Sequence, residues 1–262
     1  MKNRLFQITS ILIICCLLTG TSSSAAKTNY MNYSNDKKCW YFMKNDNHKR
    51  PGGADTAKNL KNYNAYYCDC KVKKKVMYLA FDCGYEGGYT KRILKILKKN
   101  HVKATFFVTK AYVEENPDIC RRMKKDGHLV GNHTMNHPSL PSRSVSQIKQ
   151  EVKGLEKLFK KKTGYKLDKF IRPPMGEYSN RVLKVLKDMG YTTIFWSMAY
   201  YDYDPAKQPG KQFVINYFKK YYHKGAITLT HNVSKSNTDA LNSILKFMKK
   251  KNYRMALLTE LH

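Results

Sequence analysis

The sequence predicts an α/β protein, in which a parallel sheet curls into a deformed (β/α) barrel behind a short N-terminal arm. Beyond Lys73, short apolar runs with strand character alternate with longer segments whose apolar residues recur at helical spacing. Repeated β-then-α units form parallel sheets, either open or closed into a barrel. No glycine-rich phosphate loop follows the first strand, so an incomplete or irregular barrel is favoured over a nucleotide-binding fold.

The expected strands are short runs rich in apolar and β-branched residues, several of them bounded by glycine or polar turn residues. The first run ends at Asp82-Cys83-Gly84, and the fourth leads into Arg172-Pro173-Pro174. We expect strands at 76–81, 104–108, 128–131, 170–171, 191–196, 226–230 and 254–258.

The expected helices place apolar residues three and four positions apart. In the first of them, Ile93, Leu94 and Leu97 share one face and lysines occupy the other. Asn116 is a candidate N-cap for the second, and Gly127 follows its end. We expect helices at 89–100, 117–126, 146–162, 179–189, 212–222 and 238–251.

Two segments precede this region. Residues 1–26 combine a basic start at Lys2 and Arg4, an apolar core and a small-residue end at Ala26. This pattern predicts a secretory signal peptide, and the apolar core is shorter than the ~20 residues that an uncleaved membrane anchor needs. Residues 27–72 are polar, and we interpret them as an extended arm whose aromatic cluster at 40–42 docks on the catalytic domain, 73–262.

Charge and cysteine content restrict the function classes. The formal net charge is +30, which suits nucleic acid, an anionic membrane or an acidic cell-wall polymer, and 42% hydrophobic residues exclude a disordered chain. Export removes nucleic acid as a partner. Five cysteines follow residue 26 without a zinc-ribbon spacing, so a disulfide framework is not expected; one bridge in the N-terminal region and free thiols remain alternatives.

Six polar residues come just after predicted strands or in the loops that follow them. The carboxyl ends of parallel strands share one face of a barrel, where active sites form. Each residue taken singly is an ordinary loop residue, but six on one face predict a site. They are Asp82, His133, His137, Arg172, Asp202 and His231.

The spacing of His133 and His137 suits two metal ligands if the segment between them makes one helical turn. Asp82 adds a carboxylate and His231 a group that titrates near neutrality. A metal, a base and an acid are the parts needed to hydrolyse an amide or ester with activated water.

These residues stand within motifs that resemble the polysaccharide deacetylases of carbohydrate esterase family 4, which carry the NodB homology domain. The motifs are Phe81-Asp82-Cys83-Gly84, His133-Thr134-Met135-Asn136-His137, Arg172-Pro173-Pro174-Met175-Gly176 and Leu229-Thr230-His231. The match is closest to the delta-lactam-biosynthetic de-N-acetylase branch of sporulating bacteria. That similarity runs from about Trp40 to the C-terminus and includes Ala80-Phe81-Asp82-Cys83-Gly84-Tyr85-Glu86, Gly131-Asn132-His133 and Phe195-Trp196-Ser197.

The resemblance implies a role for each position. Asp82 matches the general base, His231 the general acid, Arg172 the arginine that orients the base, and Asp202 the carboxylate that keeps His231 charged. His133 and His137 match histidines that bind a divalent metal, for which zinc is our expectation. The implied substrate-binding residues are Pro174, Met175, Gly176, Trp196 and Leu229.

Three positions depart from the family pattern. Cys83 stands where the family has a third metal-binding Asp, so it is either a thiolate ligand of a zinc-like site or a buried, inert thiol. Met175 stands where many members have Tyr. Tyr203 follows Asp202 where Trp is common, which affects the surroundings of His231.

The branch implies a hydrolase that removes acetyl from N-acetylmuramic acid in peptide-stripped peptidoglycan, leading to muramic δ-lactam in spore cortex. Its functional partner is then an N-acetylmuramoyl-L-alanine amidase that acts first, and we expect a secreted monomer associated with the cell envelope. One alternative is deacetylation of N-acetylglucosamine in peptidoglycan or chitin-like oligomers. The alternative from another class is a non-catalytic wall-binding protein whose lysines contact acidic polymers.

Overall fold

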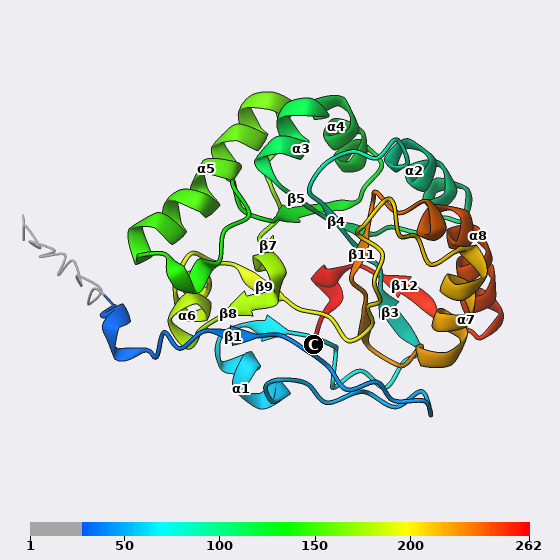
Figure 1. Ribbon diagram of the computed structural model, residues 1–262, viewed down its shortest axis with the longest axis horizontal. Helices are drawn as coiled ribbons and strands as arrows, with labels where there is room; N and C mark the ends of the chain where they lie inside the picture. The colour runs from blue at the N-terminus through cyan, green and yellow to red at the C-terminus, as the bar shows by residue number, and fades with distance from the viewer. Residues whose placement is uncertain (1–27) are drawn as a thin grey trace, which may run out of the picture.

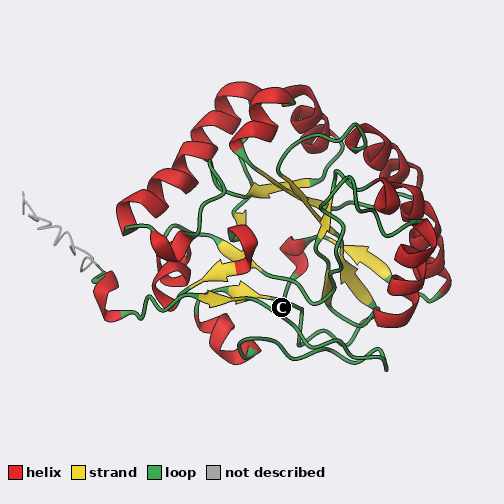
Figure 2. Cartoon of the chain, viewed as in Figure 1, coloured by secondary structure: helices red, strands yellow, loops and turns green. Residues whose placement is uncertain are grey.

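The computed structural model describes residues 28–262, so the predicted signal peptide lies outside the described residues. Strands form a curled inner layer, and most helices lie on its outer side (Figures 1 and 2). Neighbouring strands of the main sheet are all parallel. Their order is β11 (Thr230–His231), β4 (Ala80–Cys83), β5 (Thr105–Val108), β6 (Leu129–Asn132), β7 (Phe170–Ile171), β9 (Thr192–Ile194) and β2 (Ala65–Tyr66). The predicted α/β deformed barrel is confirmed.

A second parallel sheet has three strands, in the order β10 (Ala226–Ile227), β3 (Val76–Tyr78) and β12 (Arg254–Ala256). The predicted strands 76–81 and 226–230 are each divided between the two sheets. At this break the Thr228 hydroxyl accepts a hydrogen bond from the Ala80 N–H, at 3.0 Å. The Thr228 side chain here replaces the backbone carbonyl of a neighbouring strand as the hydrogen-bond acceptor. The break in the strands cannot be seen in the sequence, where the apolar run is continuous.

Helices surround the outer face of the arc. Their bounds agree with the predicted ranges to within three residues: α2 (Thr90–Lys99), α4 (Pro117–Lys125), α5 (Val145–Thr163), α6 (Asn180–Asp188), α7 (Lys211–Tyr221) and α8 (Lys235–Lys250). A short helix that we did not predict, α3 (Lys110–Glu115), begins where the Thr109 hydroxyl accepts from the Tyr112 N–H. Ser144 and Gln147 form a capping box that starts α5.

The core lies on both faces of the sheet, and β4 shows how residues divide between them. Successive side chains of a strand point to opposite faces. Phe81 and Cys83 pack in the apolar cluster that also holds residues of α2, α4, α5 and α8. Ala80 packs instead in the interior cluster with Phe107. Asp82 shares the interior side with Ala80, so this alternation aims its carboxylate away from the helices.

The N-terminal arm is partly folded and wraps beneath the sheet (Figure 1). It holds β1 (Lys38–Cys39), which pairs antiparallel with β8 (Glu177–Tyr178), and α1 (Ala57–Asn62). Its last part, β2, is an edge strand of the main sheet. Of the aromatic cluster at 40–42, Trp40 is 5% exposed whereas Tyr41 is 59% exposed, so Trp40 is the member that docks fully.

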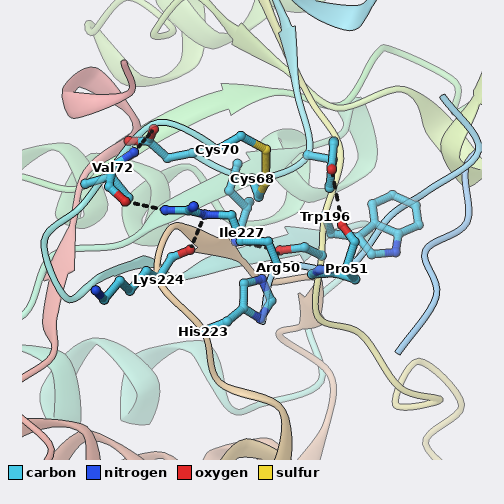
Figure 3. The surroundings of a disulfide bond; sticks show 12 residues. Arg50, Pro51, Cys68, Cys70, Val72, Trp196, His223, Lys224 and Ile227 are labelled. Atoms are coloured by element: carbon cyan, nitrogen blue, oxygen red, sulfur yellow. Dashed lines mark hydrogen bonds between the residues drawn. A yellow bond between two sulfur atoms is a disulfide. The ribbon is translucent and has the colours of Figure 1, made fainter. Parts of the chain in front are cut away.

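A single disulfide within the described residues joins Cys68 to Cys70, so the structure contains the one N-terminal bridge that the sequence left as an alternative. Figure 3 shows the surroundings of this bridge, where Arg50, an earlier residue of the arm, donates hydrogen bonds to the carbonyls of Val72 and Lys224. In residues 28–262, no helix has the length and apolarity to cross a membrane.

Candidate active site

A buried ion pair lies at the centre of the site. Arg172, directly after β7, is fully buried, and its Nη1 donates to Asp82 Oδ1 at 2.7 Å. Its other nitrogens donate to the carbonyls of Thr228, at 3.0 Å, and Ile194, at 3.3 Å. The guanidinium is therefore fixed by backbone as well as by its counter-charge, and it occupies one oxygen of Asp82.

The pKa of Asp82 lies below its ordinary value. Burial alone would raise this pKa, but the positive charge of Arg172, followed by the influence of His133 and His231, outweighs the burial. Asp82 is consequently ionised at neutral pH. A carboxylate with one oxygen held by a cation and the other unprotonated is able to accept a proton at a fixed position.

His133 and His137 come together, with ring centroids 4.7 Å apart. The helical turn that was the condition for their pairing is not what joins them: Thr134 and His137 have positive φ angles, 68° and 53°, in an irregular loop. The loop is held because Asn132 Oδ1 accepts from the Thr134 N–H at 2.8 Å. The two rings are therefore brought together by a loop with left-handed backbone angles, which a local hydrogen bond stabilises.

Both imidazoles are uncharged at neutral pH. Burial lowers the pKa of His133 to about 4 and also lowers that of His137. The 3.6 Å contact between His133 Nε2 and Asp82 Oδ2 is thus a contact between a neutral ring and a carboxylate. His133 Nδ1 lies 2.8 Å from the carbonyl of Arg172 and so carries the proton, which leaves the lone pair on Nε2.

His231 lies beside Asp82 because β11 pairs with β4 in a register that puts these two residues opposite each other. His231 Nδ1 donates to Asp202 Oδ1 at 2.6 Å, and the same carboxylate accepts from the His231 N–H at 2.8 Å. Burial would lower the pKa of His231, but the hydrogen bond and the negative charge of Asp202 outweigh it and raise that pKa. Asp202 is itself fully buried and accepts from Asn237.

A cavity of about 760 Å³ opens in front of these groups, and apolar and aromatic side chains form most of its wall. Its lining residues are Asp82, Gly84, Tyr85, His133, His137, Pro173, Met175, Gly176, Trp196, Tyr203, Leu229, His231, Asn232 and Val233. Of the expected substrate-binding residues, Met175, Gly176, Trp196 and Leu229 line it. Pro174, the first residue of a 3₁₀ turn, does not line it, and the preceding Pro173 does.

Known proteins are similar to this chain in sequence. The sequence model of a family described as polysaccharide deacetylase matches residues 69–194. The peptidoglycan-N-acetylmuramic acid deacetylase PdaA of Bacillus subtilis is 36% identical over 249 residues, covering 95% of this chain and 94% of PdaA. The chain belongs to the polysaccharide deacetylase family.

A solved structure and a further sequence relative agree with this assignment. The structure of Bacillus subtilis PdaA, a family 4 carbohydrate esterase, superposes with a TM-score of 0.83 at 38% identity and covers 87% of this chain and 97% of that one. A peptidoglycan-N-acetylglucosamine deacetylase of Bacillus cereus is 33% identical over 193 residues, covering 72% of this chain and 88% of the relative. The protein is thus a hydrolase of the deacetylase class.

The zinc-like site with Cys83 as a ligand is wrong. Cys83 is fully buried in the cluster between sheet and helices, and burial raises the pKa of its thiol well above the ordinary value. Because it is adjacent to Asp82 on a strand, it points to the opposite face. Within residues 28–262, no group of three or more His, Cys, Asp or Glu side chains is arranged to hold a metal ion. The two neutral imidazoles fit two positions of a metal site, without a third.

We therefore expect Cys83→Ser to leave divalent metal binding unchanged. The substitution should lower the free energy of unfolding by about 1–3 kcal/mol, because it buries a hydroxyl among apolar side chains. Isothermal titration with Zn²⁺ would measure stoichiometry and affinity, and thermal unfolding would measure stability. His137→Ala is the matched comparison and should weaken metal binding; a loss in Cys83→Ser of the same size would restore the thiolate hypothesis.

Other residues of the site were missed from the sequence. Tyr85, Asn232 and Val233 line the cavity, and Tyr203, which we considered only as a departure from the family pattern, also lines it with its ring centroid 5.8 Å from that of His231. Val233 and Asn232 follow the His231 motif directly, so their position along the chain was an available clue. The Tyr203 ring keeps an aromatic side chain next to His231 although the expected Trp is absent.

Proposed function

We propose that this deacetylase removes the N-acetyl group from N-acetylmuramic acid in peptide-stripped peptidoglycan. The observation that carries the chemistry is the side-by-side placement of Asp82 and His231, with opposite pKa shifts, at one cavity. The substrate is proposed from the similarity to PdaA, which covers nearly the whole of both chains.

In the proposed reaction, Asp82 Oδ2 takes a proton from a water molecule as that water attacks the acetyl carbonyl. The tetrahedral intermediate then collapses as His231 Nε2 donates a proton to the departing nitrogen, giving acetate and a free amine. Arg172 fixes Asp82 and keeps it ionised, while Asp202 fixes the ring of His231 and keeps it protonated. The pKa of Asp82 is lowered and that of His231 is raised, so each shift favours the protonation state that its step requires.

We further propose that His133 and His137 hold a divalent cation through their neutral rings. Such an ion would polarise the acetyl oxygen and stabilise the negative charge that develops on it. His133 has its free Nε2 at the Asp82 side of the cavity, and its Nδ1–H is held by the Arg172 carbonyl, which orients the ring. Titration with a series of divalent ions would identify the one that binds most tightly.

The second candidate substrate is N-acetylglucosamine. It is favoured by the composition of the cavity wall, because no Lys or Arg is among the lining residues of the described chain. The lactyl group of muramate adds a carboxylate that a cationic wall would recognise, whereas glucosamine has none. The Bacillus cereus relative carries the glucosamine deacetylase name.

Mass spectrometry after incubation with peptide-stripped glycan and with chitin oligomers separates the two substrates. We expect loss of acetyl from muramate residues in the stripped glycan, followed by loss of water if the lactyl carboxyl closes on the new amine. Closure is favoured because both groups sit on one sugar. Deacetylation of chitin oligomers alone would reject the muramate proposal.

The cellular setting follows from this substrate. We propose an extracytoplasmic monomer that acts on the cell wall, in the spore cortex, after an N-acetylmuramoyl-L-alanine amidase has removed the stem peptides. The net charge of +30 would hold the protein on an anionic wall. The proposal includes no role for nucleic acid.

A further inference from the structure

We propose that Trp40, on the N-terminal arm, is a positioning residue that fixes the substrate-facing wall of the deacetylase cavity. Trp40 does not line the cavity, and it lies outside residues 69–194 that match the family. It contacts two segments that do line the cavity, the turn at Pro174–Gly176 and Trp196. The inference rests on the proposed function in one respect: peptide-stripped glycan is the substrate used in its kinetic test.

The first contact is with the turn. The backbone N–H of Trp40 donates to the carbonyl of Gly176 at 2.9 Å, which continues the pairing of β1 with β8. Gly176 has φ +68°, and a Cβ there would lie 2.7 Å from the Trp196 ring and 3.2 Å from Trp40 Cβ. The turn is therefore enclosed between the two tryptophans, and Met175 at its tip is 55% exposed at the cavity.

The second contact is with the segment that follows β9 and carries Trp196. Trp40 Nε1 donates to the carbonyl of Trp196 at 2.9 Å. The Trp40 ring also stacks on Phe195, with centroids 4.9 Å apart and planes at 23°. Trp40 thus fixes two segments of the cavity wall, the turn through its backbone N–H and the Trp196 segment through its indole.

The arm holds the Trp40 ring in one position. The Tyr67 ring lies 4.9 Å away, and a Cβ on Gly53 would come within 2.5 Å of the indole. The segment after Gly53 is tied back because the Ala54 N–H donates to the Tyr41 carbonyl at 3.0 Å. Figure 3 shows the preceding Arg50 and Pro51: Arg50 donates to the carbonyls of Val72 and Lys224, and the Pro51 carbonyl accepts from the Tyr67 hydroxyl at 3.1 Å.

The shorter hydrogen bonds of Arg172, which holds the base, go to groups that Trp40 does not contact. Arg172 donates to Asp82 at 2.7 Å and to the Thr228 carbonyl at 3.0 Å, whereas its bonds to the Ile194 and Phe195 carbonyls, in the segment beside Trp40, are longer, at 3.3 and 3.4 Å. A disturbance at Trp40 therefore moves the wall that binds the glycan and leaves the proton-transfer groups in place. The expected signature is a change in KM without a change in kcat.

Trp40→Phe tests this separation because it retains an aromatic ring while removing the indole N–H. We expect KM for peptide-stripped glycan to rise about five- to tenfold, as for the loss of one buried hydrogen bond. We expect kcat within about twofold and an unchanged pH profile. Tyr41→Ala is the matched control, since the neighbouring side chain is exposed and points away. An unchanged KM would overturn the proposal, and so would a loss of activity that merely matches the fraction of unfolded protein.

Fluorescence provides a readout that needs no activity. The chain has two tryptophans, so with excitation selective for tryptophan over tyrosine Trp40→Phe leaves Trp196 as the sole emitter. The reference is the Trp196 contribution in the wild type, obtained by subtracting the Trp196→Phe spectrum from the wild-type spectrum. Relative to it, we expect the Trp196 emission of Trp40→Phe to be red-shifted and to be quenched more strongly by acrylamide. Unchanged emission would contradict the proposal. A wild-type protein inactive on stripped glycan would reject the proposed function, while this measurement would still test Trp40.

Discussion

Asp82→Asn is expected to lower kcat by about 10²–10⁴-fold, the range typical of a lost general base. The amide retains an oxygen that accepts the hydrogen bond from Arg172 Nη1, but it cannot take a proton from water. Acetate release from peptide-stripped glycan measures the effect. Asp118→Asn is the control, because that carboxylate is 87% exposed and lies outside the cavity.

The same substitution leaves the Arg172 guanidinium buried without a counter-charge. We expect the free energy of unfolding to fall by about 3–5 kcal/mol, so kcat must be expressed per folded molecule, as measured by circular dichroism. Muramic δ-lactam in cells whose only copy of the protein carries Asp82→Asn provides an independent check. Normal lactam content would show that Asp82 is not the base and would favour the non-catalytic wall-binding alternative.

His231→Asn is expected to produce the second large loss, again about 10²–10⁴-fold in kcat, because the departing amine then has no acid to protonate it. Amide nitrogen is a poor leaving group unless it is protonated, so the defect should fall on collapse of the intermediate. Acetate release measures the effect. If His231→Asn retained full activity, another group would have to supply the proton.

The pH profile identifies the roles of the pair. The base must be ionised, and its lowered pKa keeps Asp82 ionised on acidification. The acidic limb of kcat/KM is therefore expected to come first from protonation of His133, whose pKa is about 4, and of His137, because the proposed cation needs both rings neutral. The acid must be protonated, so activity falls as pH rises through the raised pKa of His231, above pH 6.5. Asp202→Asn should move this alkaline limb to lower pH. Asp204→Asn, two residues along the same loop, should leave it in place; equal shifts in both variants would assign the effect to general surface charge.

Much of the site could be predicted because its residues belong to short local motifs. Asp82, His133, Arg172 and His231 each stand at the carboxyl end of a strand, and parallel strands bring such ends together whatever the details of packing. The order of strand and helix segments along the chain was visible for the same reason, since each element carries its own periodicity. The helix α3 was missed because six residues provide too little of that periodicity.

Errors arose where a side chain's direction decides its role. Cys83 is one residue from Asp82, and strand alternation sends it into the helix-facing core, a consequence of period two that the sequence already contained. Pro174 and Pro173 are chemically identical in the motif, and only the 3₁₀ turn decides which of them lines the cavity. The loop from His133 to His137 depends on left-handed backbone angles that the residue spacing does not specify.

By itself the sequence determined the fold class, the order of elements and the residue types of the site, because these depend on periodicity and on local motifs. Only the tertiary structure decided the register that puts His231 opposite Asp82, and the pKa shifts, which arise from burial and from charges distant along the chain. It alone revealed Trp40 behind the cavity wall, far before Gly176 and Trp196 in the chain. Contacts across such separations follow from the packing of the whole sheet, and no local pattern records them.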